Sequence, residues 1–294
     1  MPMTDFQGII PILVTPFDAQ GRIDTDSLQS LVEFNIAAGV HGLGIALGSE
    51  IFKLTGDERD LVLKLVVDTV KGRVPVVMNS SAPGTDIAVA QARRAEELGA
   101  DGLMIYPVSF MPTGPEAVLD LFERIDAATT LPIILQDVPQ APIGAEMARR
   151  IVLHAHRTAA IKVETLPTVP QVLRMADKVA GQLTVIGGAG GSYMIEEFCR
   201  GARGTMPFCS QPEDFVAVWD DLTSDRAGAA RERFDSRIMA INRLAAQDGD
   251  LFYHVHKQIL QRRGVIATAF VRSPTCGIDG ITQLEIDALL EQLF

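Results

Sequence analysis

A lysine and a glutamate two residues apart are the side chains that point most directly to chemistry. Lys162 and Glu164 end an apolar run that begins at Ala159. Residues two apart on a strand project from the same face, so both groups would point the same way. Removing an amine from water favours its neutral form, which attacks carbonyl carbon. Two other interpretations stay open from the residues alone, an ion pair between the two side chains and a solvated lysine.

Two other apolar runs also end in polar residues that could orient a substrate. Gly48 and Ser49 follow the run 42–46 and would offer backbone N–H groups and a hydroxyl to a carboxylate. Gln136 and Asp137 end a later run and carry an amide and an acid. The alternatives are a plain tight turn at Gly48 and hydrogen bonds from the amide and acid to loop backbone.

A glycine-rich segment, the histidines and the cysteines give no metal or dinucleotide motif. Residues 187–191 read Gly-Gly-Ala-Gly-Gly, but Tyr193 occupies the position of the last glycine in the dinucleotide pattern. The segment could still let backbone approach a ligand, with phosphate the less favoured one. Two pairs of histidines are spaced two residues apart, which on a helix does not bring them to one point. The three cysteines are expected to be reduced and structural, and no metal is expected.

Eight short apolar runs, each followed by a helical pattern, must position these residues. The runs cover residues 8–15, 42–46, 74–80, 102–106, 132–137, 159–164, 183–188 and 204–208. Strands that alternate with helices at this spacing indicate βαβ units and a parallel sheet. Eight such units in about 210 residues predict an α/β fold, a closed (β/α)8 TIM barrel in preference to an open doubly wound sheet. The active site of a barrel lies at the carboxyl ends of its strands, where the polar residues above fall.

Helical patterns fill the rest of the chain. Asp24 or Thr25 would cap the first helix, and Thr55 with Glu58 forms a capping box before the second. Within the barrel, helices are expected at about 25–39, 55–72, 85–99, 115–128, 145–154, 169–179 and 194–202. The pattern is then wholly helical, over 212–222, 225–247, 251–264 and 282–293. We therefore expect a barrel over residues 1–210 and a C-terminal helical bundle over 211–294 that packs on it.

Composition and charge exclude several classes of protein. Of the 294 residues, 47% are hydrophobic and 21% are charged, which is ordinary for a soluble globular chain. The 37 acidic against 26 basic residues give a net charge of −11, which disfavours contact with a nucleic acid. No apolar run approaches the ~20 residues that span a bilayer, and the first residues lack a secretory pattern. We expect a cytoplasmic protein with neither nucleic acid nor membrane as a partner.

The chain resembles the dihydrodipicolinate synthase / N-acetylneuraminate lyase family over nearly its whole length. The resemblance is carried by the segments 14–17, 42–50, 97–102, 161–162, 200–204, 263–266 and 271–272. It implies a (β/α)8 barrel with a C-terminal helical bundle and a homo-oligomer, either a dimer or a tetramer. It also implies that Lys162 condenses with the 2-keto group of the substrate.

Several positions differ from the pattern that is usual in the family. The carboxylate-binding stretch GTTGE reads ALGSE here, and Gln136 stands where a YNVP-like motif carries its tyrosine. Ala141 occupies the place of the arginine that dihydrodipicolinate synthases use for an aldehyde's carboxylate. The partner tyrosine after the fourth strand is also missing, although Tyr106 lies one residue earlier.

The residues found at these positions are similar to those of the family branch that contains L-2-keto-3-deoxyarabonate dehydratase. That similarity implies a Schiff-base-forming lyase that dehydrates a 2-keto-3-deoxy sugar acid. Lys162 would form the imine, Glu164 would remove a C3 proton and help the C4 hydroxyl leave, and Gln136 would orient the substrate. The residues expected to bind the substrate are Gly48, Ser49, Thr15 and Gly188. No cofactor is expected, because the imine itself is the electron sink.

Two alternatives remain open. One is a pyruvate-dependent aldolase or synthase, such as a divergent 4-hydroxy-tetrahydrodipicolinate synthase. The missing tyrosines and arginine count against it. The other is a non-catalytic binder of 2-keto acids on an inherited barrel. The pair Lys162 and Glu164 counts against that, because a binder would not need a buried reactive amine.

Overall fold

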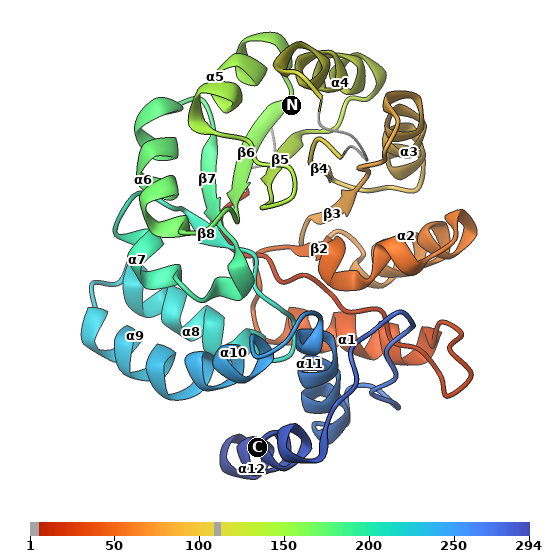
Figure 1. The fold of residues 1–294 in the computed structure, drawn as a ribbon, viewed down its shortest axis with the longest axis vertical. Coiled ribbons are helices and arrows are strands. Elements are labelled where there is room, and N and C mark those ends of the chain that lie inside the picture. The colour runs from red at the N-terminus through yellow and green to blue at the C-terminus, as the bar shows by residue number, and fades with distance from the viewer. Residues whose placement is uncertain (1–5, 109–112) are drawn as a thin grey trace. The chain divides into compact units, whose positions relative to one another are not determined.

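The computed structural model describes residues 6–108 and 113–294, and in them eight short strands alternate with helices (Figure 1). The strands are β1 (Gly8–Ile9), β2 (Leu43–Ile45), β3 (Val76–Asn79), β4 (Gly102–Ile105), β5 (Ile133–Asp137), β6 (Thr158–Val163), β7 (Thr184–Gly187) and β8 (Gly204–Thr205). They form one sheet in the order β1-β8-β7-β6-β5-β4-β3-β2. The N–H of His41, just before β2, donates to the Ile9 carbonyl of β1 at 2.8 Å.

The helices follow the strands in the order that the sequence predicts. Those that alternate with the strands are α1 (Thr25–Ala37), α2 (Gly56–Val70), α3 (Thr85–Glu97), α4 (Pro115–Ala128), α5 (Ala145–His154), α6 (Thr168–Lys178), α7 (Met194–Phe198) and α8 (Pro212–Thr223). The later helices are α9 (Ala227–Arg233), α10 (Met239–Ala245), α11 (Leu251–Arg262) and α12 (Gly280–Leu293). This alternation, with helices after α8, confirms the predicted (β/α)8 fold class with a C-terminal helical extension.

The chain divides into two compact units. Unit 1 comprises Met1–Ile10, His41–Gly44 and Val74–Pro207, and it holds β3 to β8 with α3 to α7. Unit 2 comprises Pro11–Val40, Ile45–Arg73 and Phe208–Phe294, and it holds α1, α2 and α8 to α12. The sequence-based boundary between residues 210 and 211 stays a prediction.

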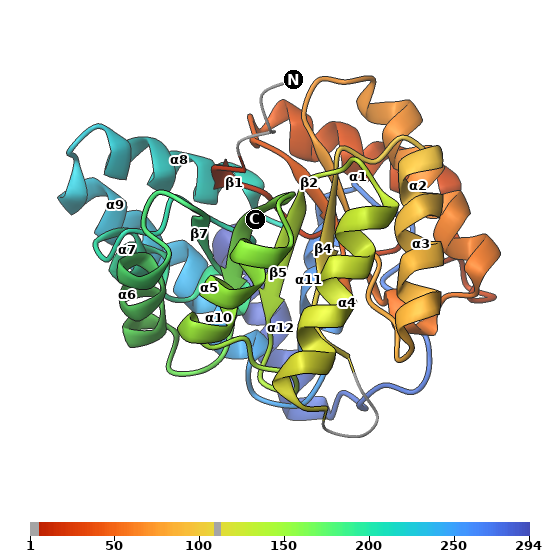
Figure 2. The ribbon, with the colours of Figure 1, turned by 90° about the horizontal axis from the view of Figure 1, so that it is seen from above.

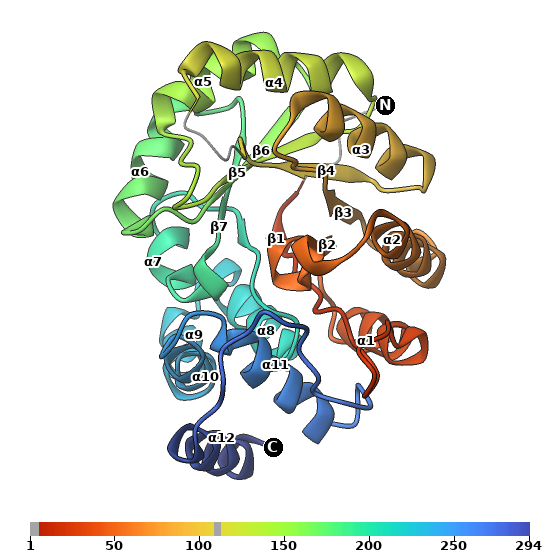
Figure 3. The ribbon, with the colours of Figure 1, turned by 45° about the vertical axis from the view of Figure 1, so that its right-hand side comes forward.

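The strands of unit 1 are buried on both faces. Every residue of β3, β4 and β5 is buried, as expected of parallel strands with side chains inside and helices outside. Helices α3 to α7 follow one another around the outer face of the strands in chain order (Figures 1 and 3). Figure 2 shows α3 and α4 side by side. In the sheet, Gln136 of β5 is level with Lys162 of β6, which brings the ends of these two strands together.

The strands β1 and β8 are much shorter than the apolar runs that predicted them. The run 8–15 contributes only β1, and the run 204–208 contributes only β8. Pro11 follows β1 closely and Pro207 follows β8 closely. Proline has no N–H to donate, so it cannot continue the hydrogen-bond ladder.

Capping residues begin the first two helices of unit 2, α1 and α2, as the sequence predicts. The Asp24 side chain accepts from the N–H of Ser27 at the start of α1. Thr55 and Glu58 bond reciprocally, at 3.3 and 3.0 Å, and so form the predicted capping box of α2. Helices α1 and α2 pack side by side. Farther along, α10, α11 and α12, the three helices that Figure 3 labels near the C-terminus, pack around an apolar cluster.

The single helix expected over 225–247 is interrupted. Between α9 and α10 lies a π-helical turn, η4 (Phe234–Ile238). The buried residues Ala230, Phe234 and Ile238 are spaced by four twice in succession, which is longer than the 3.6-residue repeat of an α-helix. A wider turn keeps all three on the buried side. The buried carboxylate of Asp214 holds the turn, because it contacts both Arg233 and Arg237.

None of the helices in the described ranges is long and apolar enough to span a lipid bilayer.

Candidate active site

Strand β6 positions Lys162, and Glu164 follows one residue past its end. Lys162 Nζ lies 2.9 Å from Glu164 Oε1, and these side chains are 5% and 18% exposed. The N–H of Glu164 donates to the Asp137 carbonyl at 2.9 Å, which extends the pairing of β5 and β6 past the strands. The ion pair between Lys162 and Glu164, which was one of the interpretations open from the sequence, is therefore present. It also places a carboxylate beside the amine that would form an imine.

Gln136, on the neighbouring strand β5, contacts the other oxygen of Glu164. Its Nε2 donates to Glu164 Oε2 at 2.9 Å, and its side chain is buried. Each oxygen of Glu164 thus has one partner, the Lys162 amine on Oε1 and the Gln136 amide on Oε2. An acid–base group held in this way has a fixed orientation.

The structure adds a residue that the sequence analysis missed. Asn79 ends β3, and its Nδ2 donates to Gln136 Oε1 at 3.0 Å. Its Oδ1 accepts from the N–H of Ser81 at 3.0 Å, and the Ser81 hydroxyl accepts from the N–H of Tyr106 at 2.9 Å. The available signal was the one used for Gln136, a polar residue that closes an apolar run. Residues at the ends of β3 and β5, together with Glu164 after β6, thus form one hydrogen-bonded row, although β4 lies between β3 and β5 in the sheet.

Asp137 bonds residues of the nearby loops rather than the side chains of Asn79, Gln136 and Glu164. Its carboxylate accepts from the N–H of Ile143 at 2.8 Å and from the hydroxyl of Thr165 at 2.7 Å. It also accepts from the N–H of Thr165 at 3.2 Å. The interpretation that the end of β5 bonds loop backbone is therefore right for Asp137, whereas Gln136 bonds side chains.

Gly188, after β7, adjoins Glu164. A β-carbon on Gly188 would lie 2.2 Å from Glu164 Cγ and 2.9 Å from the Val163 carbonyl oxygen. Real side-chain contacts are never so short, so only glycine fits there. The glycine-rich segment therefore leaves space for the Glu164 side chain.

A second buried carboxyl lies behind the neighbouring glycine. A β-carbon on Gly187 would lie 2.0 Å from Glu197 Oε2, and the Glu197 side chain is fully buried. Glu197 Oε1 accepts from the Thr168 hydroxyl at 2.5 Å. Burial raises the pKa of Glu197 to about 7, against the lowering effect of the Thr168 hydrogen bond. Glu197 is therefore a carboxyl that holds its proton near neutral pH.

The other expected substrate-binding residues lie in unit 2. The Ser49 hydroxyl donates to the Leu13 carbonyl and accepts from the N–H of Ala46 at 3.1 Å. The Thr15 hydroxyl donates to the Ser49 carbonyl at 2.6 Å. A β-carbon on Gly48 would lie 2.9 Å from a methyl carbon of Ile12. The structure brings Thr15, Gly48 and Ser49 together, and both hydroxyl protons bond backbone carbonyls.

A buried ion pair holds the turn that carries Ser49. Glu50 is fully buried with φ 56°, in the left-handed region. Its carboxylate contacts Lys257 Nζ at 2.5 Å and Lys53 Nζ at 3.1 Å. Burial lowers the pKa of Lys257 to about 8, which the neighbouring Glu50 partly opposes. These contacts fix Glu50, the residue that directly follows Ser49 in the chain.

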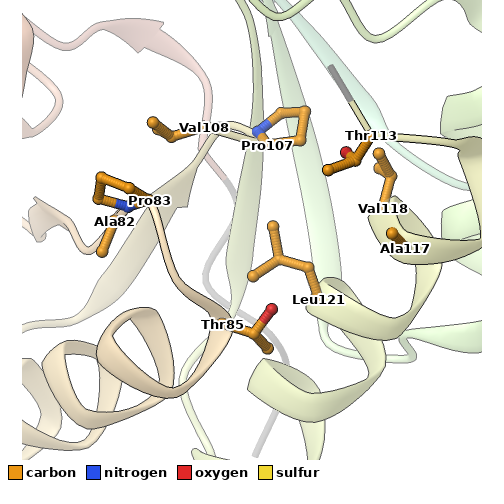
Figure 4. Close-up of a pocket in the computed structure, with 9 residues that line it drawn as sticks. All are labelled: Ala82, Pro83, Thr85, Pro107, Val108, Thr113, Ala117, Val118 and Leu121. Carbon is orange, nitrogen blue, oxygen red and sulfur yellow. The ribbon is translucent and has the colours of Figure 1, made fainter. Parts of the chain in front are cut away.

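A small pocket in unit 1 lies between the loops that follow β3 and β4 (Figure 4). Its lining residues are Ala82, Pro83, Thr85, Pro107, Val108, Thr113, Ala117, Val118 and Leu121. None of these side chains titrates, so they offer no acid–base group. Over residues 6–108 and 113–294, no three His, Cys, Asp or Glu side chains gather in a way that could hold a metal ion.

Comparison with known proteins relates the chain to one enzyme family. The model of the dihydrodipicolinate synthetase family matches residues 5–293. L-2-keto-3-deoxyarabonate dehydratase of Azospirillum brasilense is 31% identical over 300 aligned residues, which cover 98% of this chain and 94% of that protein. 4-Hydroxy-tetrahydrodipicolinate synthase of Pseudomonas aeruginosa is 42% identical over 135 residues, 45% of this chain and 46% of that protein.

A solved structure shows the same likeness in three dimensions. The crystal structure of dihydrodipicolinate synthase from Rhodopseudomonas palustris superposes with a TM-score of 0.89 at 26% identity, over 99% of both chains.

Proposed function

This chain belongs to the dihydrodipicolinate synthetase family and is a lyase of that family, and from that premise we propose that it dehydrates a 2-keto-3-deoxy sugar acid through an imine on Lys162. The observation that carries the proposal is the placement of Glu164, with one oxygen at Lys162 and the other at Gln136. The full-length similarity to the Azospirillum dehydratase supports the choice of reaction.

The first step makes the substrate acidic at C3. The neutral amine of Lys162 adds to the C2 carbonyl, and the hydroxyl group formed takes up one proton from solvent and leaves as water, which gives a protonated imine. Hydrolysis of the imine at the end of the reaction returns that proton. Glu164 then takes a proton from C3, and the bonding pair moves toward the imine nitrogen to form an enamine. A carboxylate 2.9 Å from the reacting nitrogen is within reach for this transfer.

The second step expels the C4 hydroxyl. Glu164 returns its proton to that hydroxyl, which leaves as water while the enamine electrons form a C3–C4 double bond. Hydrolysis of the imine frees Lys162 and uses the equivalent of the water lost at condensation. The net change is the loss of one water. Where C5 is the terminal carbon and carries a hydroxyl, tautomerisation of the unsaturated product gives a semialdehyde.

The remaining groups would hold the substrate rather than exchange protons. Gln136 cannot titrate, so its proposed role is to orient Glu164 and the substrate. We propose that Gly48, Ser49 and Thr15 form the segment that binds the substrate's carboxylate. The N–H groups of Ser49 and Glu50 already donate to carbonyls within that turn, which leaves this role to the backbone at Gly48. Gly188 would act by leaving space for Glu164.

Homo-oligomeric assembly and a cytoplasmic location stay predictions from the sequence.

A synthase or aldolase is the second candidate. It is favoured by the 42% identity to the Pseudomonas synthase, although that match covers less than half of this chain. Against it stand Gln136 in place of a titrating tyrosine and Ala141 in place of an arginine. The dehydratase needs neither group, because Glu164 supplies the proton transfers.

A substrate panel tests the proposal. Purified protein is incubated with 2-keto-3-deoxy pentonates and hexonates of each configuration, and the product is measured by mass as the loss of one water. The proposal expects product from at least one of these acids and little condensation of pyruvate with aspartate semialdehyde. Rapid condensation with no dehydration of any panel member would show that the synthase is the right assignment.

A further inference from the structure

We propose that Asn79 is a positioning residue that fixes which end of the Gln136 amide faces Glu164, with the direction set by the backbone N–H of Ser81. The proposal rests on the proposed function in one respect, the role of Glu164 in proton transfer. Its structural part, the direction of the hydrogen-bonded row, stands on the contacts alone.

The direction follows from one donor that cannot be reversed. A backbone N–H can only donate, so the atom of Asn79 that faces Ser81 at 3.0 Å must be the carbonyl oxygen Oδ1. The amino group Nδ2 then faces Gln136 at 3.0 Å, and the atom that meets it must be the acceptor Oε1. The amino group of Gln136 is left to face Glu164 Oε2 at 2.9 Å.

The reversed arrangement would be costly at both ends of the Gln136 amide. It would set the Gln136 carbonyl oxygen against a carboxylate oxygen of Glu164, and the Gln136 amino group against the amino group of Asn79. Gln136 and Asn79 are buried, so water could not compensate. Buried polar groups left without a partner cost about 1–3 kcal/mol each in general. Asn79 therefore allows one orientation of the amide.

This orientation assigns different tasks to the two oxygens of Glu164. Oε2 receives a fixed donor from Gln136, and Oε1 faces the Lys162 nitrogen. The imine forms at that nitrogen, so Oε1 is the oxygen nearest the carbons that lose a proton and a hydroxyl. We assign the proton transfer to Oε1, with Oε2 as the anchored oxygen.

A double-mutant cycle tests whether Asn79 acts through Gln136. The variants are Asn79→Ala, Gln136→Ala and the combination, with Gln182→Ala as a control on an exposed glutamine of the same unit. The readouts are C3 deuterium exchange of pyruvate in heavy water and the rate of imine formation, trapped with borohydride. Asn79→Ala should slow exchange about tenfold because Glu164 loses its fixed geometry, while imine formation changes less than about twofold. In the Gln136→Ala background the same substitution should slow exchange less than about twofold.

A merely structural role for Asn79 gives a different pattern. The loss would then be the same in both backgrounds, and imine formation would fall along with exchange. Either result overturns the proposal, as does unchanged exchange in Asn79→Ala.

A spectroscopic readout separates this inference from the proposed function. The side-chain amide signals of Gln136 in nitrogen-15-labelled protein are assigned by their loss in Gln136→Ala. They should move in both Asn79→Ala and Glu164→Gln, and stay in place in Gln182→Ala. Unmoved signals in Asn79→Ala overturn the inference even if the enzyme is active. Moved signals in a protein that forms no imine support the inference and refute the proposed function.

Discussion

A β-carbon on Gly188 would lie 2.2 Å from Glu164 Cγ, so the Glu164 side chain occupies the space that a side chain at Gly188 would need. We expect Gly188→Ala to displace Glu164 from Lys162 and Gln136. Imine trapping should persist, while C3 exchange falls at least about tenfold because the base is misplaced. The control is Gly144→Ala, where an added β-carbon meets no atom within 4 Å. Equal exchange in the two variants would show that Glu164 does not need its present position.

Lys162 should be the residue that forms the imine. Lys162→Ala should give no adduct when protein, pyruvate and borohydride are mixed, as measured by intact mass. Lys178→Ala, which removes an exposed lysine paired with Glu146, should give the same adduct as the unmodified protein. An adduct that persists in Lys162→Ala would place the reactive amine elsewhere.

Glu164→Gln should separate imine formation from proton transfer. The glutamine keeps the size of the side chain but removes the base, so the adduct on Lys162 should still form. C3 exchange should fall by at least ~10²-fold, the low end of what a positioned acid–base group contributes. Glu146→Gln, on the exposed face of α5, is the matched control. Normal exchange in Glu164→Gln would point to Tyr106 or a bound water as the base.

Glu197 should make the stability of the fold depend on pH. Burial raises the pKa of its carboxyl from 4.5 to about 7, so the folded state holds the proton more tightly than the unfolded state. The free energy of unfolding should therefore fall as the pH rises from about 4.5 to about 7, by roughly 3 kcal/mol from this residue. Urea unfolding of the unmodified protein and of Glu197→Gln across this range measures the effect. The variant should lack this part of the slope, and identical slopes would contradict the assignment.

The fold was largely predictable because each barrel strand is short and apolar and is followed by a helical pattern. Runs such as 132–137 carry this signal locally, since both faces of a parallel strand are covered. The pattern of apolar residues does not predict where a strand ends when the end is set by a missing hydrogen-bond donor. Strand β1 shows this, because Pro11 follows it closely. Glu50 shows the other limit, because its left-handed backbone is held by Lys257, which lies 207 residues away in the chain.

The candidate site was predictable in part for a similar reason. Lys162 and Glu164 share one strand, so their relation follows from the two-residue repeat alone. The contact of Gln136 with Asn79 joins strands 57 residues apart, and no local pattern encodes it. The space at Gly188 is likewise defined by a neighbour on another strand. The sequence could identify the polar residues at the ends of strands. Which of these residues contact one another depends on the register of the sheet, which the sequence pattern does not give.

The π-helical turn η4 gives this chain one place where its length can change at little cost. A π turn holds about one residue more than the α-helical turn it replaces. Deleting a single residue within Phe234–Ile238 should let α9 and α10 join as continuous α-helix with both flanking faces still buried. The same deletion inside α10 would rotate every later residue by about 100° and turn Ile241 and Leu244 out of their apolar cluster. The segment from α9 to α10 can therefore lose one residue without changing which faces of the two helices are buried. A deletion should be tolerated there because of the π turn, even where the deleted residue is buried.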